Sequence, residues 1–253
     1  MRKIARYGWQ KDSLDPRDFK LASPVKVGEL PSQVDLSGFL SAPFDQGQLG
    51  SCTGNAIANA IIFEQNRQLI FRVIPSRLFI YYNERAMEGT TASDSGAQIR
   101  DGFKSVAAQG ACPEENWLYT ESLFAVKPPD SCYALALRDL VSSYLSVNQD
   151  VDSMRACLAS QYPFVFGFTV YESFESEAVA QSGIVPMPTP GEAIVGGHAV
   201  LCVGYDDAAQ QFIIRNSWGP DWGQAGNAKM PYAYLADASL CADFWTIRSL
   251  QVA

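Results

Sequence analysis

Histidine is nearly absent from this chain, because its 253 residues include only one, His198. Zinc sites usually combine several cysteine and histidine ligands at short spacings. The six cysteines include no C-x-x-C pair, so a zinc site is not expected and no motif calls for another metal or a cofactor. Any chemistry that needs an imidazole must use His198.

Clusters of basic residues and long apolar runs are also missing. The formal net charge is −8, which argues against nucleic acid or an anionic membrane surface as a partner. The longest nearly apolar run, Ala193 to Tyr205, is too short to span a bilayer. The first 18 residues carry positive charge without an apolar stretch behind it, so no intact signal peptide is present, and secreted and cytoplasmic locations both stay open.

Three short segments carry the residue types of a thiol hydrolase. They are QGQLGSC ending at Cys52, GGHAV around His198 and NSWG beginning at Asn216. A cysteine nucleophile needs a base, a group that orients the base, and donors for the oxyanion. Cys52, His198, Asn216 and Gln46 can fill these roles. Each residue alone would be read as structural, as a core thiol, a strand histidine or a turn residue, but together they favour catalysis.

The remaining five cysteines leave the redox compartment open. Their odd number allows at most two disulfides, and Cys112 with Cys132 is the best candidate pair. Cys202 lies in the apolar segment VLCVGY and is expected to be a buried strand thiol. At 47% apolar residues, the chain can form a sizeable core without any disulfide.

Apolar periodicity divides the chain into a helical half and a strand half. Ile57, Ala60, Ile61 and Phe63 predict a helix that begins near Cys52, where the helix N-terminus favours a thiolate. Further helices are predicted after a cap at Ser76, from 99 to Gly110, and from 151 to 160. Strands are predicted at 163–171, 198–207, 211–218 and 243–249. A loop is predicted at 183–197. The expected fold class is α+β, with a helical lobe over about 36–128, a strand lobe over about 129–253 and a cleft between them for an extended peptide.

The three motifs resemble those of the papain-like cysteine peptidases. The resemblance runs from about Leu30 to the end of the chain, and Cys52 and His198 are 146 positions apart, within the family's range of about 130 to 150. The resemblance implies a papain-like two-lobe fold, in which a helical lobe and an antiparallel β-barrel-like lobe flank the active site. It also implies hydrolysis of peptide or protein substrates without a cofactor, and a protein inhibitor as a further candidate partner.

The resemblance also assigns roles to individual residues. Gln46, six positions before Cys52, would donate to the oxyanion together with the Cys52 N–H, which leaves Gln48 as a loop amide. Asn216 would orient His198, and Trp218 would shield their hydrogen bond from water. Gly96 would pair with the substrate backbone, although a plain turn glycine is the alternative.

Some features depart from the common family pattern. Leu49 stands where the plant and lysosomal members have a disulfide cysteine, and Thr53 stands where an aromatic residue is common. The chain resembles the bacterial members more than the plant and lysosomal ones in three further segments, Gly8-Trp9, Asp15-Pro16-Arg17-Asp18 and Asp243-Phe244-Trp245. Two other functions stay open: an amide transferase or peptide ligase on the same fold, and a catalytically silent peptide-binding module.

Residues 1–29 precede Leu30-Pro31, where the family's catalytic domain, residues 30–253, would begin. They are too few for the long helical prodomain of many relatives, yet they include Tyr7, Trp9, Phe19 and Leu21, which a free tail would not need. We favour an arm packed permanently on the strand lobe. The alternative is a short propeptide that borders or crosses the cleft.

Overall fold

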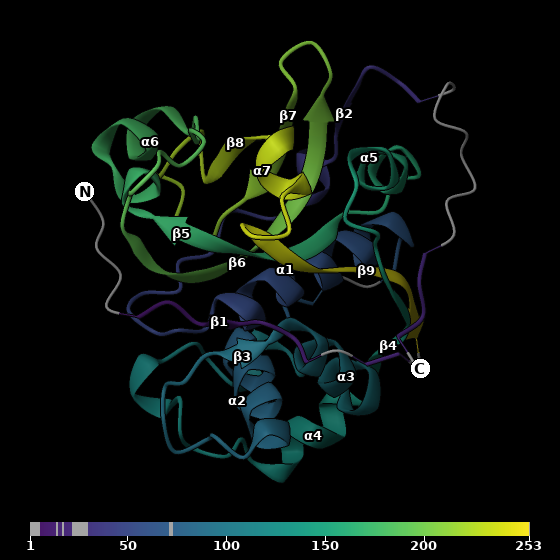
Figure 1. The fold of residues 1–253 in the computed structure, drawn as a ribbon. Helices are drawn as coiled ribbons and strands as arrows, with labels where there is room; N and C mark the ends of the chain where they lie inside the picture. Colours follow the sequence, from purple (N-terminus) through teal and green to yellow (C-terminus); the bar gives the residue numbers. More distant parts are fainter. Residues whose placement is uncertain (1–5, 14, 17, 22–29, 71–72, 253) are drawn as a thin grey trace.

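The computed structural model describes residues 6–13, 15, 16, 18–21, 30–70 and 73–252. Helix α1, Cys52–Arg67, lies between a helical lobe and a lobe built on a sheet (Figure 1). Its residues from Cys52 to Gln65 are all buried, because small residues such as Gly54 and Ala58 let neighbouring elements approach on every side. The helix therefore forms the common core of both lobes, as the predicted α+β arrangement requires.

The helical lobe contains two further helices that periodicity predicts, and a third, α4 (Asp130–Ala136), that was not predicted. Helix α2, Arg77–Glu88, begins at Ser76, whose hydroxyl accepts a hydrogen bond from the backbone N–H of Phe79 at 3.1 Å. Helix α3, Ile99–Gln109, ends at Gly110. Helix α4, Asp130–Ala136, packs on Phe79 and so extends the helical lobe past residue 128. Two short 3-10 turns complete the lobe: η3, Glu114–Asn116, and η4, Glu121–Leu123.

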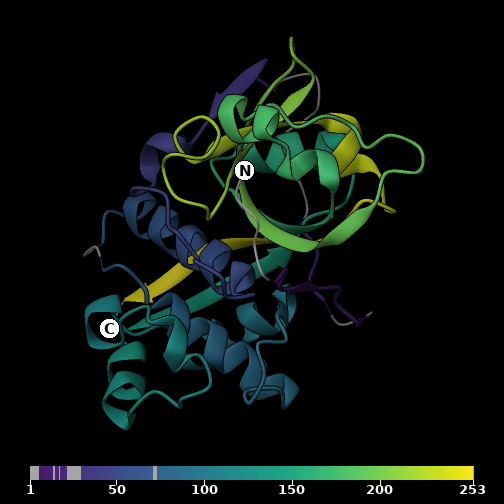
Figure 2. The ribbon, with the colours of Figure 1, turned by 90° about the vertical axis from the view of Figure 1, so that its left-hand side faces the viewer.

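Seven antiparallel strands form the sheet lobe, in the order β4-β9-β5-β6-β7-β8 with β2 paired to β6. Their bounds are Gln33–Asp35 for β2, Asp139–Ser146 for β4, Phe164–Tyr171 for β5, Ile194–Asp206 for β6, Gln211–Arg215 for β7, Asn227–Pro231 for β8 and Cys241–Val252 for β9. The strands curve around the upper lobe in Figure 2, where α5, α6 and α7 (Val151–Ala159, Glu177–Ser182 and Tyr232–Ala236) cover them. Two 3-10 turns, η2 at Ser37–Phe39 and η5 at Glu172–Glu175, lie in the connections.

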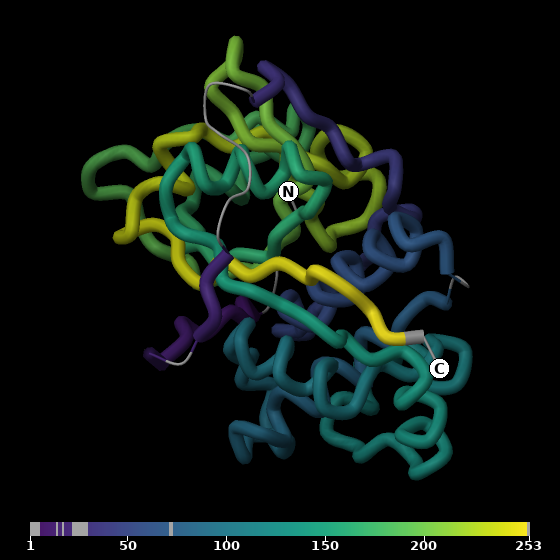
Figure 3. Tube along the Cα trace, turned by 90° about the vertical axis from the view of Figure 1, so that its right-hand side faces the viewer, coloured from purple at the N-terminus to yellow at the C-terminus, as the bar shows by residue number. Residues whose placement is uncertain are grey.

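Strands β4 and β9 connect the two lobes. They run side by side from the sheet toward the helical lobe (Figure 3), with Val141 opposite Leu250 and Tyr144 opposite Ile247. Strand β4 was not predicted from the sequence. Strand β6 begins at Ile194, so the last residues of the predicted loop at 183–197 belong to a strand.

All six cysteines are buried and unbridged. The expected disulfide between Cys112 and Cys132 is not formed, although the two thiols interact with each other. Burial and the neighbouring Cys132 raise the pKa of the Cys112 thiol. Within the described residues no helix is long and apolar enough to cross a membrane.

The N-terminal segment runs between the lobes. Strand β1, Trp9–Gln10, pairs in parallel with β3, Ala97–Gln98, and also contacts β5 and β6 (Figure 1). Farther along, residues 18–21 follow the end of β4, where Leu21 N–H donates to the Ser146 carbonyl at 2.8 Å. Residues 1–5, 14, 17 and 22–29 of the predicted arm lie outside the described residues.

Candidate active site

Cys52 is the first residue of α1, as the apolar spacing predicts. Unpaired N–H groups at this end of the helix carry partial positive charge, which stabilises a thiolate. The sulfur lies against β6, since the backbone N–H of Ala199 interacts with it. Ala199 directly follows His198, so packing of α1 on β6 brings the thiol and the imidazole strand together.

His198 and Asn216 form the hydrogen bond expected of a base and its orienting group. The distance between His198 Nε2 and Asn216 Oδ1 is 2.8 Å, and both residues are fully buried. The Ser217 N–H donates to the same amide oxygen at 2.8 Å and fixes its direction. The Trp218 ring, only 3% exposed, lies 5.2 Å from the His198 ring between centroids and covers the pair. With Nε2 facing Asn216, Nδ1 is the nitrogen left to exchange a proton with other groups.

Gln46 and Gln48 differ sharply in their surroundings. Gln46 is buried, its Oε1 accepts from Ser217 Oγ at 2.6 Å, and its Nε2 donates to the Leu49 carbonyl at 2.9 Å. Gln48 is exposed, and its backbone N–H donates to Glu121 Oε1 at 2.9 Å. An amide NH₂ has two hydrogens, so Gln46 retains a second donor for an oxyanion. Its burial and its second amide hydrogen favour Gln46 over Gln48 for the predicted donor role.

Gly8 of the N-terminal segment covers the thiol. Its backbone interacts with the Cys52 sulfur, and its carbonyl accepts from the Ala97 N–H at 2.8 Å. The approach is so close that a Cβ added to Gly8 would overlap the Gly50 carbonyl, and one added to Gly96 would overlap Gly8. Gly96 therefore lies against the backbone of Gly8, and its pairing with a substrate backbone stays a prediction.

Two aromatic side chains flank Gly8. Tyr7 lies 6.0 Å from the His198 ring between centroids, and its hydroxyl donates to Glu175 Oε1 at 2.6 Å. The Trp9 indole N–H donates to Asp243 Oδ2 at 2.9 Å. The sequence marked the two aromatics, and it marked Asp243 only as part of the segment Asp243-Phe244-Trp245, without a role; no motif marks Glu175.

The covering segment changes the chemistry of the thiol. Burial raises the pKa of Cys52 to about 12, despite opposing hydrogen bonds from Ala199 and Gly8. The helix position alone predicts a lowered pKa, and that expectation does not hold for this state because Cys52 has no exposed surface. The covering segment thus removes the thiol from solvent and disfavours its reactive thiolate form.

A buried carboxyl group lies directly behind the nucleophile. Thr53 Oγ1 donates to Glu84 Oε1 at 2.5 Å, and Glu84 is fully buried on α2. Burial raises the pKa of Glu84 well above its ordinary value and so disfavours its charged form. A charged Glu84 would raise the pKa of Cys52 further. Thr53, noted as a departure from the family pattern, thus has a structural partner.

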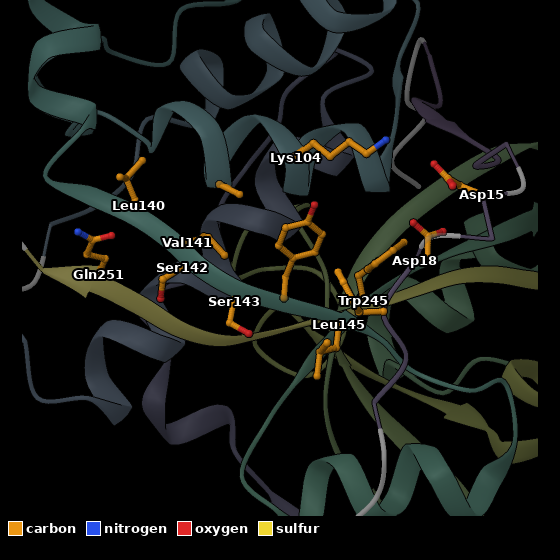
Figure 4. A pocket seen from close by; sticks show the side chains of 13 residues that line it. Asp15, Asp18, Lys104, Leu140, Val141, Ser142, Ser143, Leu145, Trp245 and Gln251 are labelled. Carbon is orange, nitrogen blue, oxygen red and sulfur yellow. The ribbon is translucent and has the colours of Figure 1, made fainter.

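A surface hollow of the described part of the chain lies away from Cys52 and His198. It has a volume of about 880 Å³ and lies between α3, β4 and the N-terminal segment. Figure 4 shows Lys104 on one side and Asp15, Asp18 and Trp245 on the other. No cysteine or histidine lines it, so it has no part in thiol chemistry. Nor do the described residues contain a metal-binding group of three or more His, Cys, Asp or Glu side chains.

Comparisons with known proteins agree with this geometry. A family model described as papain family cysteine protease matches residues 31–238. The structure is similar to the crystal structure of xylellain, a cysteine protease from Xylella fastidiosa, with 43% identity, a TM-score of 0.92 and 99% of each chain covered. An uncharacterized peptidase C1-like protein of Acanthamoeba polyphaga mimivirus is 40% identical over 96% of this chain and 87% of its own length. Cathepsin B-like CP2 of Giardia intestinalis is 38% identical over 35% of this chain and 29% of its own.

The family match spans more than half of the chain and includes Cys52 and His198. The fold agrees as well, with helices on one side of α1 and an antiparallel sheet on the other. The chain therefore belongs to the papain family of cysteine proteases.

Proposed function

We propose that this cysteine protease hydrolyses peptide bonds through an acyl-enzyme on Cys52, with His198 as the general base and acid. His198 Nδ1 would take the Cys52 proton, and the thiolate would attack the substrate carbonyl carbon. The oxyanion would accept hydrogen bonds from Gln46 Nε2 and the Cys52 N–H. His198 would then return the proton to the leaving amine and activate the water that releases the acyl group.

The buried hydrogen bond between His198 and Asn216 supports this assignment most directly. It fixes the plane of the imidazole and directs Nδ1 away from Asn216. A silent binding module would have no need of an oriented imidazole beside a cysteine at a helix N-terminus. An amide transferase would use the same residues, but nothing in the structure favours an amine over water as the acceptor.

The experiment is to incubate the protein with a peptide library and identify the products by mass spectrometry. We expect hydrolysed peptides, loss of cleavage in Cys52→Ala and His198→Ala, and a smaller loss in Asn216→Ala, which orients the base without taking the proton. Peptides joined to added amines would indicate a transferase. Cleavage that survives Cys52→Ala would disprove the assignment.

We further infer that residues 6–10 inhibit the enzyme by occupying its cleft. Gly8 interacts with the thiol and contacts Gly50 and Gly96, so no substrate carbonyl can reach Cys52 while it is there. The segment also pairs with β3 through Ala97, an edge that a peptide substrate would need. A protein inhibitor directed at Cys52 would have to displace the same residues. This favours the propeptide interpretation over the permanent arm.

Substitution Gly8→Ala tests the inhibition without shortening the chain. The added methyl group would overlap the Gly50 carbonyl, so the segment should leave the cleft. We expect an epoxysuccinyl inhibitor to label Cys52 faster in this variant than in the unmodified chain, and to label no other cysteine. Equal labelling rates would show that the segment does not limit access to the thiol.

A further inference from the structure

Two glycines from different loops bound the space beside Cys52 through which the N-terminal segment passes. Gly50 lies in the loop before α1, and Gly96 lies in the loop between α2 and β3. A Cβ added to Gly50 would lie 3.3 Å from the Gly8 Cα, and one added to Gly96 would overlap the Gly8 carbonyl. The two glycines therefore leave room for one backbone, and a substrate that replaces Gly8 depends on the distance between their loops.

Asp94 connects the two loops by hydrogen bonds. Its two carboxylate oxygens accept from the Gly50 N–H, each at 3.1 Å. The hydroxyl of Tyr81, a fully buried residue of α2, donates to the same carboxylate and accepts from the Gly96 N–H at 3.1 Å. One carboxylate and one hydroxyl thus link the backbone of Gly50 to that of Gly96.

Helix α2 fixes the loop that carries Asp94. The Arg85 side chain is fully buried, and its Nη1 donates to the carbonyls of Thr91 at 3.0 Å and Ser93 at 2.8 Å. Its guanidinium carbon also lies 3.9 Å from the centroid of the Tyr81 ring. Groups held by a helix are placed more accurately than groups held by loops alone. Asp94 therefore has a rigid support on one side of the cleft.

The loop before α1 has no covalent support of this kind. Leu49 stands where other members of the family have a disulfide cysteine, and all six cysteines of this chain are unbridged. The N-terminal segment does not supply the connection either, because Arg6 donates to the Asp94 carbonyl at 3.2 Å and not to its carboxylate. The hydrogen bonds from Asp94 to Gly50 can therefore persist when the segment leaves the cleft.

We propose that Asp94 is a positioning residue that holds Gly50 and Gly96 one backbone apart, so that an extended peptide can enter beside Cys52. This inference rests on the proposed peptidase function and adds a residue to it. Asp94 acts through the two glycines and has no part in the proton transfers. Without its carboxylate, the Gly50 N–H and the Tyr81 hydroxyl lose their acceptor, and the loops can move apart. The thiol keeps its place at the start of α1.

The test compares two reagents that both alkylate Cys52. An epoxysuccinyl peptide has to lie between the loops, whereas iodoacetamide is too small to depend on them. Both are applied to the full-length Gly8→Ala variant, in which the segment is displaced. We expect Asp94→Ala to slow Cys52 labelling by the peptide reagent roughly tenfold or more and to leave the iodoacetamide rate unchanged. Asp94→Asn retains one acceptor oxygen and should give an intermediate rate.

Tyr81→Phe provides a second test, which also covers the case in which Asp94→Ala does not fold. It removes one hydroxyl and leaves the hydrogen bonds between Asp94 and Gly50 in place. We expect the same selective loss with the peptide reagent. If the two residues form one connection, the double variant should lose little more than Asp94→Ala alone. Losses that multiply in the double variant would contradict a single connection.

Glu121→Gln is the matched control, because Glu121 is an exposed carboxylate that binds the same loop through the Gln48 N–H at 2.9 Å. It should change neither rate. Equal losses with both reagents in Asp94→Ala, no loss at all, or a similar loss in Glu121→Gln would overturn the proposal.

Peptide cleavage separates this inference from the proposed function. Cleavage that is as fast in Asp94→Ala as in the Gly8→Ala reference would overturn the role of Asp94 and leave the peptidase function intact. Absence of both cleavage and Cys52 labelling in the reference would refute the function and this inference together.

Discussion

The residues proposed to carry the chemistry could be named from the sequence because their roles require fixed residue types. His198 is the only imidazole, and its partner Asn216 follows 18 positions later, in the strand hairpin that a turn between two apolar runs predicts. Asp243 and Glu175 could not be identified in this way. Their positions depend on the bulge in β9 and on the 3-10 turn after β5, which no pattern of side chains reveals.

The choice between Gln46 and Gln48 gives a prediction at the scale of single residues. Removal of one preorganised oxyanion donor typically lowers kcat by about 10²- to 10³-fold. We expect Gln46→Ala to fall in this range and Gln48→Ala to change kcat little, since Gln48 is exposed and interacts through its backbone. Steady-state kinetics on one peptide in the Gly8→Ala background measures both. The opposite ranking would assign the donor to Gln48.

At the scale of elements, helices were predicted better than the strands at the sheet edges. Helices α1, α2, α3 and α5 have clear apolar periodicity, and α2 also has its cap at Ser76. Strands β5, β6, β7 and β9 are rich in buried β-branched and aromatic residues. Strand β4 lies at one edge with mostly half-buried side chains and no strict alternation, and β8 at the other edge alternates but has only five residues, which is too short a pattern to predict a strand.

The contact between the N-terminal segment and β9 is predicted to depend on pH. Burial, and then the nearby Asp243, raise the pKa of Asp12 to about 7, although Trp245 and Arg100 donate hydrogen bonds to it. A released segment would restore an ordinary value of about 4. Between these two pH values, Asp12 takes up a proton when the segment docks. Docking is therefore strongest below about pH 4 and weakens as the pH rises through 7. Its equilibrium constant can fall by about tenfold per pH unit.

The measurement is the rate of Cys52 labelling in the full-length chain from pH 4 to pH 8. We expect the rate to rise more steeply than in Gly8→Ala, which reports the titration of the thiol alone. In Asp12→Asn the docked segment has no carboxyl group to titrate at this position, so the extra pH dependence should shrink. An unchanged profile in Asp12→Asn would exclude Asp12 as the titrating group.

At the scale of the whole molecule, the sequence predicted two lobes and a catalytic cleft, and for the N-terminal segment it favoured a permanent arm over a propeptide. Its aromatic residues showed only that the segment packs somewhere. Its path over Cys52 is fixed by backbone contacts of Gly8 with Gly50 and Ala97, which depend on the absence of side chains and leave no apolar pattern. The packing of Tyr7, Trp9 and Leu21 on the core means that one segment can both stabilise and inhibit the protein.

Removal of residues 1–29 separates these two contributions. The truncated chain loses the burial of Tyr7 and Trp9 and therefore has a lower free energy of unfolding. Each kcal/mol of unfolding free energy lost lowers the melting temperature of a chain of this size by roughly 2–4 °C. We therefore expect a melting temperature lower by several degrees together with kcat/KM at least tenfold higher, because Cys52 regains access to substrate and a lower pKa. Phe19→Ala serves as the control, since that side chain is 78% exposed, and it should change neither quantity. A truncated enzyme that melts earlier without cleaving faster would identify the segment as a structural arm alone.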